Sequence, residues 1–172
     1  MALREILVAP DPKLKIKARR VETFDDALRQ LLDDMVETMY AAKGIGLAAP
    51  QIGVPLRAIV MDLARDEEED AAPRKFLNPE IVWESDDEVP CEEGCLSVPG
   101  QYAEVTRPAQ CRVRYQDENG VRHEIDCDGL LAVCIQHEMD HLEGVLFVDH
   151  LSTLKRNMIL RKVSKARRQQ AS

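Results

Sequence analysis

No stretch of this 172-residue chain approaches the ~20 consecutive apolar residues that a membrane-spanning helix requires. The apolar run at the start of the chain is too short for a secretion signal, and Pro10 and Pro12 interrupt it. The five cysteines are odd in number and lack the spacing of a disulfide framework. We therefore expect a protein of the reducing cytoplasm, without a membrane partner.

What the chain does contain is an ordinary globular composition, with 45% apolar and 31% charged residues. This balance is not that of a disordered chain, and the length suits one compact domain. The charge is uneven. Residues 151–172 hold seven basic residues and no acid, which leaves 16 basic and 31 acidic residues, a net charge of −15, in the rest. An acidic body disfavours DNA as a partner, whereas the basic tail is either a solvated helix face or a local contact with nucleic acid.

Apolar periodicity predicts three helices. Residues 24–39 have apolar side chains at three- and four-residue steps, after a capping-box pattern at Thr23–Asp26, and Gly44 follows their end. Residues 130–142 are apolar on nearly every face, which indicates a buried helix. A weaker stripe after Ser152, a candidate cap, predicts a final helix.

Four segments are expected to be strands: 56–62, 76–83, 111–116 and 121–127. The last two flank Asp117-Glu-Asn-Gly120, which is typical of a hairpin turn. The acidic run at 66–70 is expected to be a solvated loop. Together the elements predict a single α+β domain with one buried helix near its end.

The buried helix carries the chemistry. His137, Glu138 and His141 fit the pattern H-E-x-x-H, in which two histidines one turn apart grip a metal ion and the glutamate acts as a general base on a water. Buried polar groups without partners are costly, and a metal would satisfy the histidines. In one class of zinc proteases the third ligand is a histidine six residues after the second histidine, but that position is Phe147 here. In another class it is a glutamate further along the chain, but no acid follows Asp149. The third ligand is therefore expected upstream.

Cys95, in Cys91-Glu-Glu-Gly-Cys95, is the candidate third ligand, which would leave one coordination position open for water. The alternative is a closed structural site of Cys91, Cys95, His137 and His141. However, the 41 residues between Cys95 and His137 exceed the usual ~12–15 of zinc fingers. Cys111 and Cys127 are expected in the core, and His123 and His150 at the surface. Cys134 either lines the pocket or joins the metal.

A glycine-rich segment, Gly44-Ile-Gly-Leu-Ala-Ala-Pro-Gln51, follows the first helix. It lacks the strand before it and the helix after it that a dinucleotide-binding fingerprint needs. The glycines suit a backbone that approaches a ligand closely, and Gln51 offers an amide donor for a developing oxyanion. Taken alone, this segment is more simply interpreted as a turn that carries a polar residue.

Three motifs resemble those of the peptide deformylases and occur in the same order. They are Gly44–Gln51, Glu-Gly-Cys-Leu-Ser at 93–97 and Gln-His-Glu-Met-Asp-His at 136–141. The resemblance extends over most of the chain and implies a single catalytic domain spanning 1–172. Its expected fold is α+β: antiparallel sheets packed around the buried H-E-x-x-H helix, with an N-terminal helix and a basic C-terminal helix at 152–168. The implied activity is removal of the formyl group from the formyl-methionine of nascent polypeptides.

The resemblance also implies residue roles. Cys95, His137 and His141 would hold Fe²⁺, for which Zn²⁺, Ni²⁺ or Co²⁺ can substitute, with water as fourth ligand. Glu138 would take the proton of that water and pass it to the leaving amine. The Gln51 side chain and the Leu96 N–H would stabilise the oxyanion.

Further family positions imply how substrate binds. Ile45, Gly46 and Gly94 would run beside an extended peptide, while Val133 and Cys134 would form the apolar wall around the methionine side chain. The basic C-terminal helix would dock on the ribosome. Two alternatives stay open: a metallopeptidase or other metal amidohydrolase at the same site, and a ribosome-associated module with a structural metal.

Overall fold

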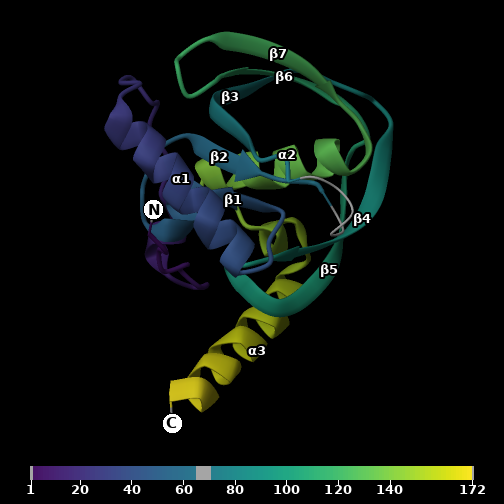
Figure 1. Ribbon diagram of the computed structural model, residues 1–172. Helices are drawn as coiled ribbons and strands as arrows, with labels where there is room; N and C mark the ends of the chain where they lie inside the picture. The colour runs from purple at the N-terminus through teal and green to yellow at the C-terminus, as the bar shows by residue number, and fades with distance from the viewer. Residues whose placement is uncertain (1, 65–70, 172) are drawn as a thin grey trace.

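The computed structural model describes residues 2–64 and 71–171, so the acidic run predicted as a loop lies outside the described residues. A five-stranded antiparallel sheet has the order β1-β2-β3-β6-β7, and β4 and β5 form a separate antiparallel pair. The strands are β1 (Gly46–Ala48), β2 (Ala58–Met61), β3 (Arg74–Glu84), β4 (Glu88–Cys95), β5 (Val98–Pro108), β6 (Cys111–Gln116) and β7 (Arg122–Cys127). Figure 1 shows α2 (Gly129–Leu142) in the middle of the molecule, among these strands.

The N-terminal helix α1 spans Asp26–Ala41. Its apolar stripe is buried against β1 and β2, where Leu32, Met35 and Met39 are completely inaccessible to solvent. The expected capping box at Thr23 was wrong, because Asp25 caps the helix by accepting a hydrogen bond from the backbone of Leu28. The cap lies two residues later than predicted because the Asp25 carboxylate can reach the first free N–H groups.

Helix α2 is buried on most of its faces, as its composition predicted. Ala132 and Ile135 pack with Phe76 of β3 and Val113 of β6 in one core cluster. Gly144, with φ of +75°, follows the helix, and its N–H bonds to the carbonyl of His141. A Cβ there would lie 2.5 Å from the Lys15 carbonyl oxygen, so only glycine allows the N-terminal segment to pass this close.

The C-terminal helix α3 (Thr153–Ala171) projects from the body (Figure 1). Ser152 caps it as predicted, by accepting a hydrogen bond from Lys155 N. Its base packs on β5 and on the short helix η3 (Phe147–His150), with Val163 buried. Two other short helices, η1 (Pro12–Lys15) and η2 (Ala49–Ile52), complete the described elements. No helix within residues 2–64 and 71–171 is long and apolar enough to cross a membrane.

The α+β fold with antiparallel sheets around the buried helix is confirmed, but three strands were not predicted. The β4–β5 hairpin contains Pro90, Gly94 and several glutamates, residues with low intrinsic preference for strands. Strand β1 has only three residues. The predicted strand at 56–62 is shorter, and the one at 121–127 begins at Arg122.

Candidate metal centre

Cys95, at the end of β4, meets His137 and His141 of α2, and one ligand atom from each lies within 4.8 Å of the others. The Sγ of Cys95 is 3.4 Å from Nε2 of His141. Both imidazoles are buried. Their ring centroids are 5.1 Å apart, because a spacing of four residues places both side chains on one face of the helix. The predicted cluster therefore forms.

A chain of charged groups orients the His137 imidazole from the side that faces away from the ligand cluster. Nδ1 of His137 is 2.9 Å from Oε1 of Glu93, so Nε2 is the nitrogen that faces the cluster. Arg107 donates to both oxygens of Glu93, at 2.5 and 2.9 Å, and its remaining Nη1 donates to Asp140 at 2.9 Å. Burial opposes ionisation of Glu93, but the hydrogen bonds from His137 and Arg107 outweigh it and hold its pKa below the usual range. His150 Nε2 lies 2.8 Å from the same Asp140 oxygen at the surface.

Sequence reasoning assigned no role to Glu93, Arg107 or Asp140. Glu93 is the first residue of the motif Glu-Gly-Cys-Leu-Ser at 93–97. The only sequence signal for its role is that a carboxylate lies two residues before the cysteine that is the candidate metal ligand. Arg107 is 14 residues away in the chain and pairs with Glu93 only because β4 and β5 are adjacent. A ligand histidine that donates its second N–H to a carboxylate has a fixed tautomer and ring orientation.

Glu138 lies beside the cluster. Its Oε1 is 3.7 Å from Nε2 of His137, and Oε2 has no hydrogen-bond partner among the described residues. Burial raises the pKa of Glu138 to about 7. Gly46 makes room for this carboxylate, since a Cβ at that position would lie 3.1 Å from Cγ and Cδ of Glu138. The carboxyl can therefore exchange a proton near neutral pH.

Gln51 faces the cluster from η2. Its Nε2 donates to Ser97 Oγ at 3.1 Å and lies 3.5 Å from Cys95 Sγ, while its Oε1 accepts from Ala48 N at 2.9 Å. These bonds fix the amide with its nitrogen toward the sulfur. Leu96 follows Cys95 directly, and its side chain fills the space over Gly44, where a Cβ would lie 2.7 Å from it.

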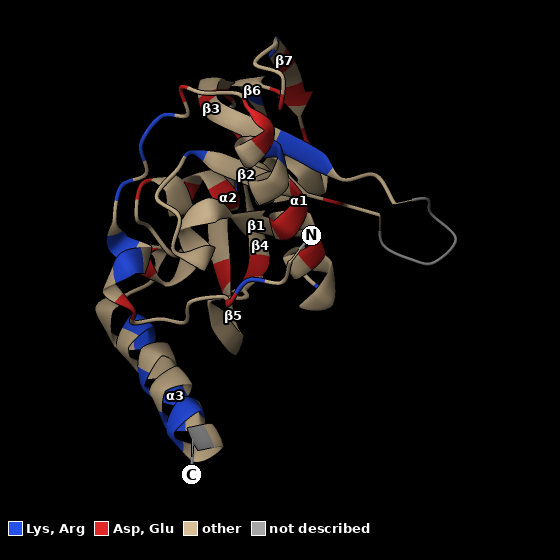
Figure 2. Ribbon diagram, turned by 60° about the vertical axis from the view of Figure 1, so that its left-hand side comes forward, with Lys and Arg blue, Asp and Glu red and all other residues tan. Residues whose placement is uncertain are grey.

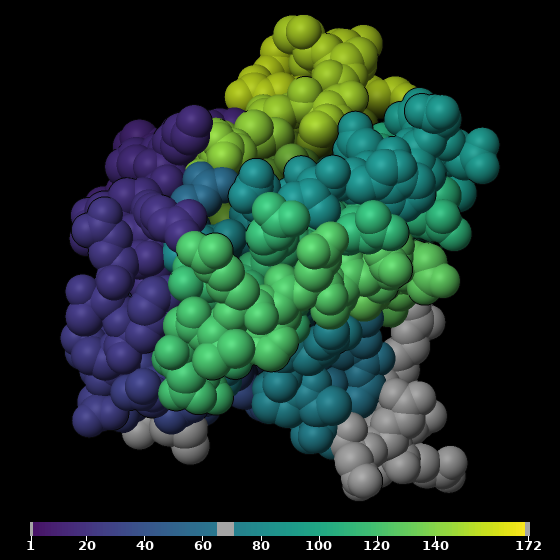
Figure 3. Space-filling model, turned by 90° about the horizontal axis from the view of Figure 1, so that it is seen from above, coloured from purple at the N-terminus to yellow at the C-terminus, as the bar shows by residue number. Residues whose placement is uncertain are grey.

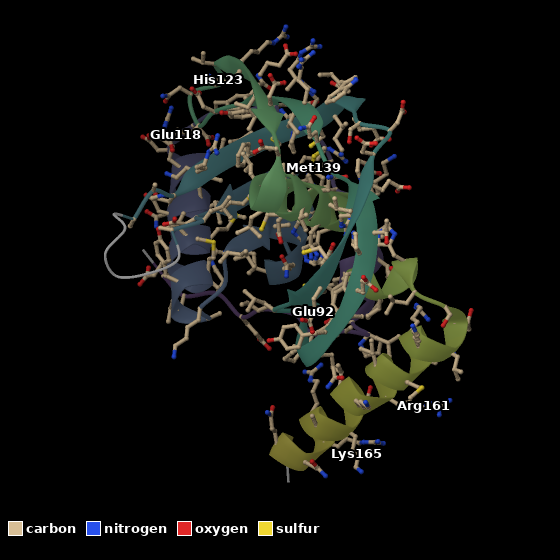
Figure 4. The ribbon with its side chains drawn as sticks, turned by 90° about the vertical axis from the view of Figure 1, so that its right-hand side faces the viewer. Glu92, Glu118, His123, Met139, Arg161 and Lys165 are labelled. Atoms are coloured by element: carbon tan, nitrogen blue, oxygen red, sulfur yellow. The ribbon has the colours of Figure 1, made fainter. Side chains whose placement is uncertain are left out.

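A pocket of about 410 Å³ opens onto the cluster. Gln51, Cys95, His137 and Glu138 line the pocket. All the residues predicted to bind substrate line it as well: Ile45, Gly46, Gly94, Val133 and Cys134. Glu92, labelled in Figure 4, marks the β4 side of its rim. The pocket therefore has an apolar wall on α2, a side lined by glycines and a polar end at the cluster.

The remaining cysteines and histidines lie outside the ligand cluster. Cys134 lines the pocket and is outside the ligand cluster. Cys91 is also outside it, and its thiol donates to the Glu92 carbonyl, so within the described chain the geometry is that of three ligands, not four. Cys111 and Cys127 are buried in the core, as predicted. His123 and His150 are exposed; Figure 4 shows His123 at the hairpin end of the molecule.

The donor set suits a divalent transition metal. One sulfur and two imidazole nitrogens converge, whereas the hard ions Mg²⁺ and Ca²⁺ prefer oxygen. The two buried imidazoles gain a common partner from a cation, and three protein ligands leave a coordination position for a reactant. The residues present therefore fit the metal that the motif predicted.

Most of the chain matches a known protein family. Residues 3–157 match the sequence model described as polypeptide deformylase. A peptide deformylase of Phenylobacterium zucineum is 65% identical over 165 residues, which cover 96% of this chain and 97% of the relative. One of Rhizorhabdus wittichii is 58% identical, with coverage of 98% and 97%.

Solved structures agree with the sequence relatives. A peptide deformylase of Legionella pneumophila superposes with a TM-score of 0.92 at 51% identity, over 99% of this chain and 98% of that one. A peptide deformylase of Ehrlichia chaffeensis in complex with actinonin gives 0.91 at 42% identity, over 96% and 98%. The chain therefore belongs to the polypeptide deformylase family, metal-dependent hydrolases that remove the formyl group from the N-terminus of polypeptides.

Proposed function

We propose that this chain hydrolyses the formyl amide of N-terminal formyl-methionine on nascent polypeptides and releases formate. The observation that carries the proposal is the Cys95–His137–His141 cluster with the buried Glu138 beside it, at the end of a pocket wide enough for a side chain. A closed structural site has no use for a carboxylate in this place. The proposal takes the chain to work in the cytoplasm, where formylated chains are made.

Cys95, His137 and His141 would hold Fe²⁺, with Zn²⁺, Ni²⁺ or Co²⁺ as substitutes. Two neutral imidazoles and one thiolate leave one positive charge on such a site, and the soft thiolate suits these metals. When bound, the cation supplies a Lewis acid that polarises a carbonyl and lowers the pKa of water. Glu93 would hold the proton of His137 on Nδ1, where it accepts a hydrogen bond, and so leave Nε2 free to bind the cation.

Glu138 would carry the proton. Among the described residues its Oε2 has no hydrogen-bond partner, so this oxygen is available as an acceptor. A pKa of about 7 lets the carboxylate accept a proton from water and return it to the amine of methionine. Gln51 Nε2 and the Leu96 N–H would donate to the oxyanion of the formyl carbon. The bonds that fix Gln51 support this role, since a preorganised donor needs no rearrangement during reaction.

The peptide would bind as an added strand. Strand β1 pairs with β2 alone among the described strands, and β4 pairs with β5 alone, so each has one open edge, and residues of both line the pocket. Ile45 and Gly46 would contact the peptide from one side and Gly94 from the other. Val133 and Cys134 would surround the methionine side chain.

Helix α3 would dock on the ribosome. Its basic residues lie along it without an acid among them (Figure 2), and Arg161 and Lys165 point away from the body (Figure 4). Leu154 and Met158 are exposed between the charges, at 70% and 46%. Removing residues 152–172 should weaken co-sedimentation with ribosomes at low salt. Unchanged binding would contradict this role.

The activity is tested by formate release from a formyl-methionyl tripeptide, using protein purified without oxygen. The acetyl-methionyl tripeptide is the matched control, since it differs by one methyl group. We expect formate from the first and no acetate from the second. Cleavage between residues would instead indicate a peptidase, and no product from protein with a full equivalent of metal would indicate a structural site.

A further inference from the structure

Two cysteines outside the metal centre face each other across the edge of the five-stranded sheet. Cys111 begins β6 and Cys127 ends β7, and the strand register places them directly opposite. Both are buried in the same core cluster, at 1% and 2% exposure. The predicted hairpin lies between these two cysteines in the sequence, and the sequence predicted only that each is a core residue.

Directly opposed residues of antiparallel strands have Cα atoms ~4.5–5.5 Å apart, within the ~4.4–6.8 Å that disulfides span. Their Cβ atoms are ~4.5–5.5 Å apart, against ~3.5–4.5 Å in a disulfide, so the side chains need to approach by roughly 1 Å. We propose that Cys111 and Cys127 form a redox site, in which a peroxide converts the two thiols into an intramolecular disulfide that small thiols reduce again.

The chemistry balances with hydrogen peroxide as the oxidant. One of the two cysteines reacts first, as its thiolate, which is the nucleophilic form. Its sulfur attacks one peroxide oxygen, the O–O bond breaks, and one water leaves to give a sulfenic acid. The sulfur of the other cysteine then displaces the second oxygen as water. Two thiols lose two electrons and two protons, and one peroxide becomes two waters.

A small oxidant has a route to the pair. A hollow of about 290 Å³ lies at this end of the hairpin, and both cysteines line it together with Trp83 and Arg112. Strand β7 is an edge strand of the described five-stranded sheet. Figure 3 shows the β6–β7 hairpin at the surface of the molecule. A thiol pair inside a closed core would lack such access.

The cross-link would act on the helix that carries the histidines. Asp128 follows Cys127 and is the N-cap of α2. A disulfide would therefore tie the start of α2 to the first residue of β6. None of the metal ligands belongs to the pair, so the modification can be measured without reference to activity.

The test uses the full chain loaded with Zn²⁺, which has no redox chemistry of its own. The protein is treated with hydrogen peroxide, denatured, alkylated and cleaved after glutamate. Cys111 is then the single cysteine of peptide 105–118, while Cys127 and Cys134 share peptide 125–138. We expect a linked pair of these peptides, two hydrogen atoms lighter than their sum, with fragment ions that place the bond at Cys127. Dithiothreitol should restore both thiols.

Cys127→Ala should abolish the linked peptide, while the control Cys91→Ala should retain it. The wild-type measurement stands even if a core variant folds poorly. Recovery of Cys111 and Cys127 as alkylated thiols after peroxide treatment would overturn the proposal. So would a bond from Cys111 to Cys134, or oxidation confined to Cys91.

Discussion

Replacing Glu93 by Gln removes the carboxylate that links His137 to Arg107 while leaving every metal ligand in place. The side chain is buried, and its two oxygens accept three hydrogen bonds, from Nδ1 of His137 and from Nε and Nη2 of Arg107. An amide nitrogen cannot accept, so at least one of these bonds is lost in Glu93→Gln. The guanidinium of Arg107 then stays buried with Asp140 as its remaining anionic partner.

Two magnitudes follow. Loss of a carboxylate behind a ligand histidine typically costs ~10–100-fold in metal affinity, which is about 1.4–2.7 kcal/mol. Leaving a buried charge without its partner costs ~3–5 kcal/mol of stability, and Asp140 keeps the expected loss near the lower end. Glu93→Gln should thus weaken metal binding and unfold at lower denaturant concentration even without metal.

The assay is competition for Zn²⁺ against a chromogenic chelator, with urea unfolding of the metal-free protein beside it. Glu92→Gln is the matched control, because Glu92 is the neighbouring residue, carries the same charge and is exposed. A metal affinity of Glu93→Gln within twofold of Glu92→Gln would refute the orienting role of the carboxylate. A loss of stability without a change in affinity would assign Glu93 to the fold alone.

Three further perturbations have defined outcomes. Gly46→Ala places a Cβ 3.1 Å from Glu138, so kcat should fall ~10-fold or more with metal content unchanged, and equal kcat would contradict the tight fit. Hydrogen bonds from Ala2 N, Gln30 and Arg4 hold the pKa of Asp34 below its usual value. This stabilisation is present above pH ~4 and is lost as pH falls through the lowered pKa. Asp34→Asn should therefore lower the free energy of unfolding at pH 7 by about 1–2 kcal/mol, with a smaller difference at pH 3; equal differences would refute the sign. The iron-loaded protein should lose activity in air because its thiolate ligand is oxidisable, whereas equal activity after long aerobic handling would count against a thiolate–iron site.

The sequence was informative where chemistry is local. The H-E-x-x-H spacing needs only the helical repeat to bring His137 and His141 together, and the stripe of α1 needs only burial of one face. The β4–β5 hairpin was missed because its stability comes from pairing between strands and not from the strand preference of residues such as Pro90 and Gly94. The same pairing creates the contact of Glu93 with Arg107 and that of Cys111 with Cys127 across their own hairpin.

Formate release by Glu138→Ala, measured beside its metal content, tests the central claim most directly. If Glu138 moves the proton, the variant should keep one metal per chain and lose nearly all turnover, while Cys91→Ala should keep both. Wild-type turnover in metal-loaded Glu138→Ala would contradict the claim, and so would loss of the metal in Cys91→Ala, which would make the site a closed structural one.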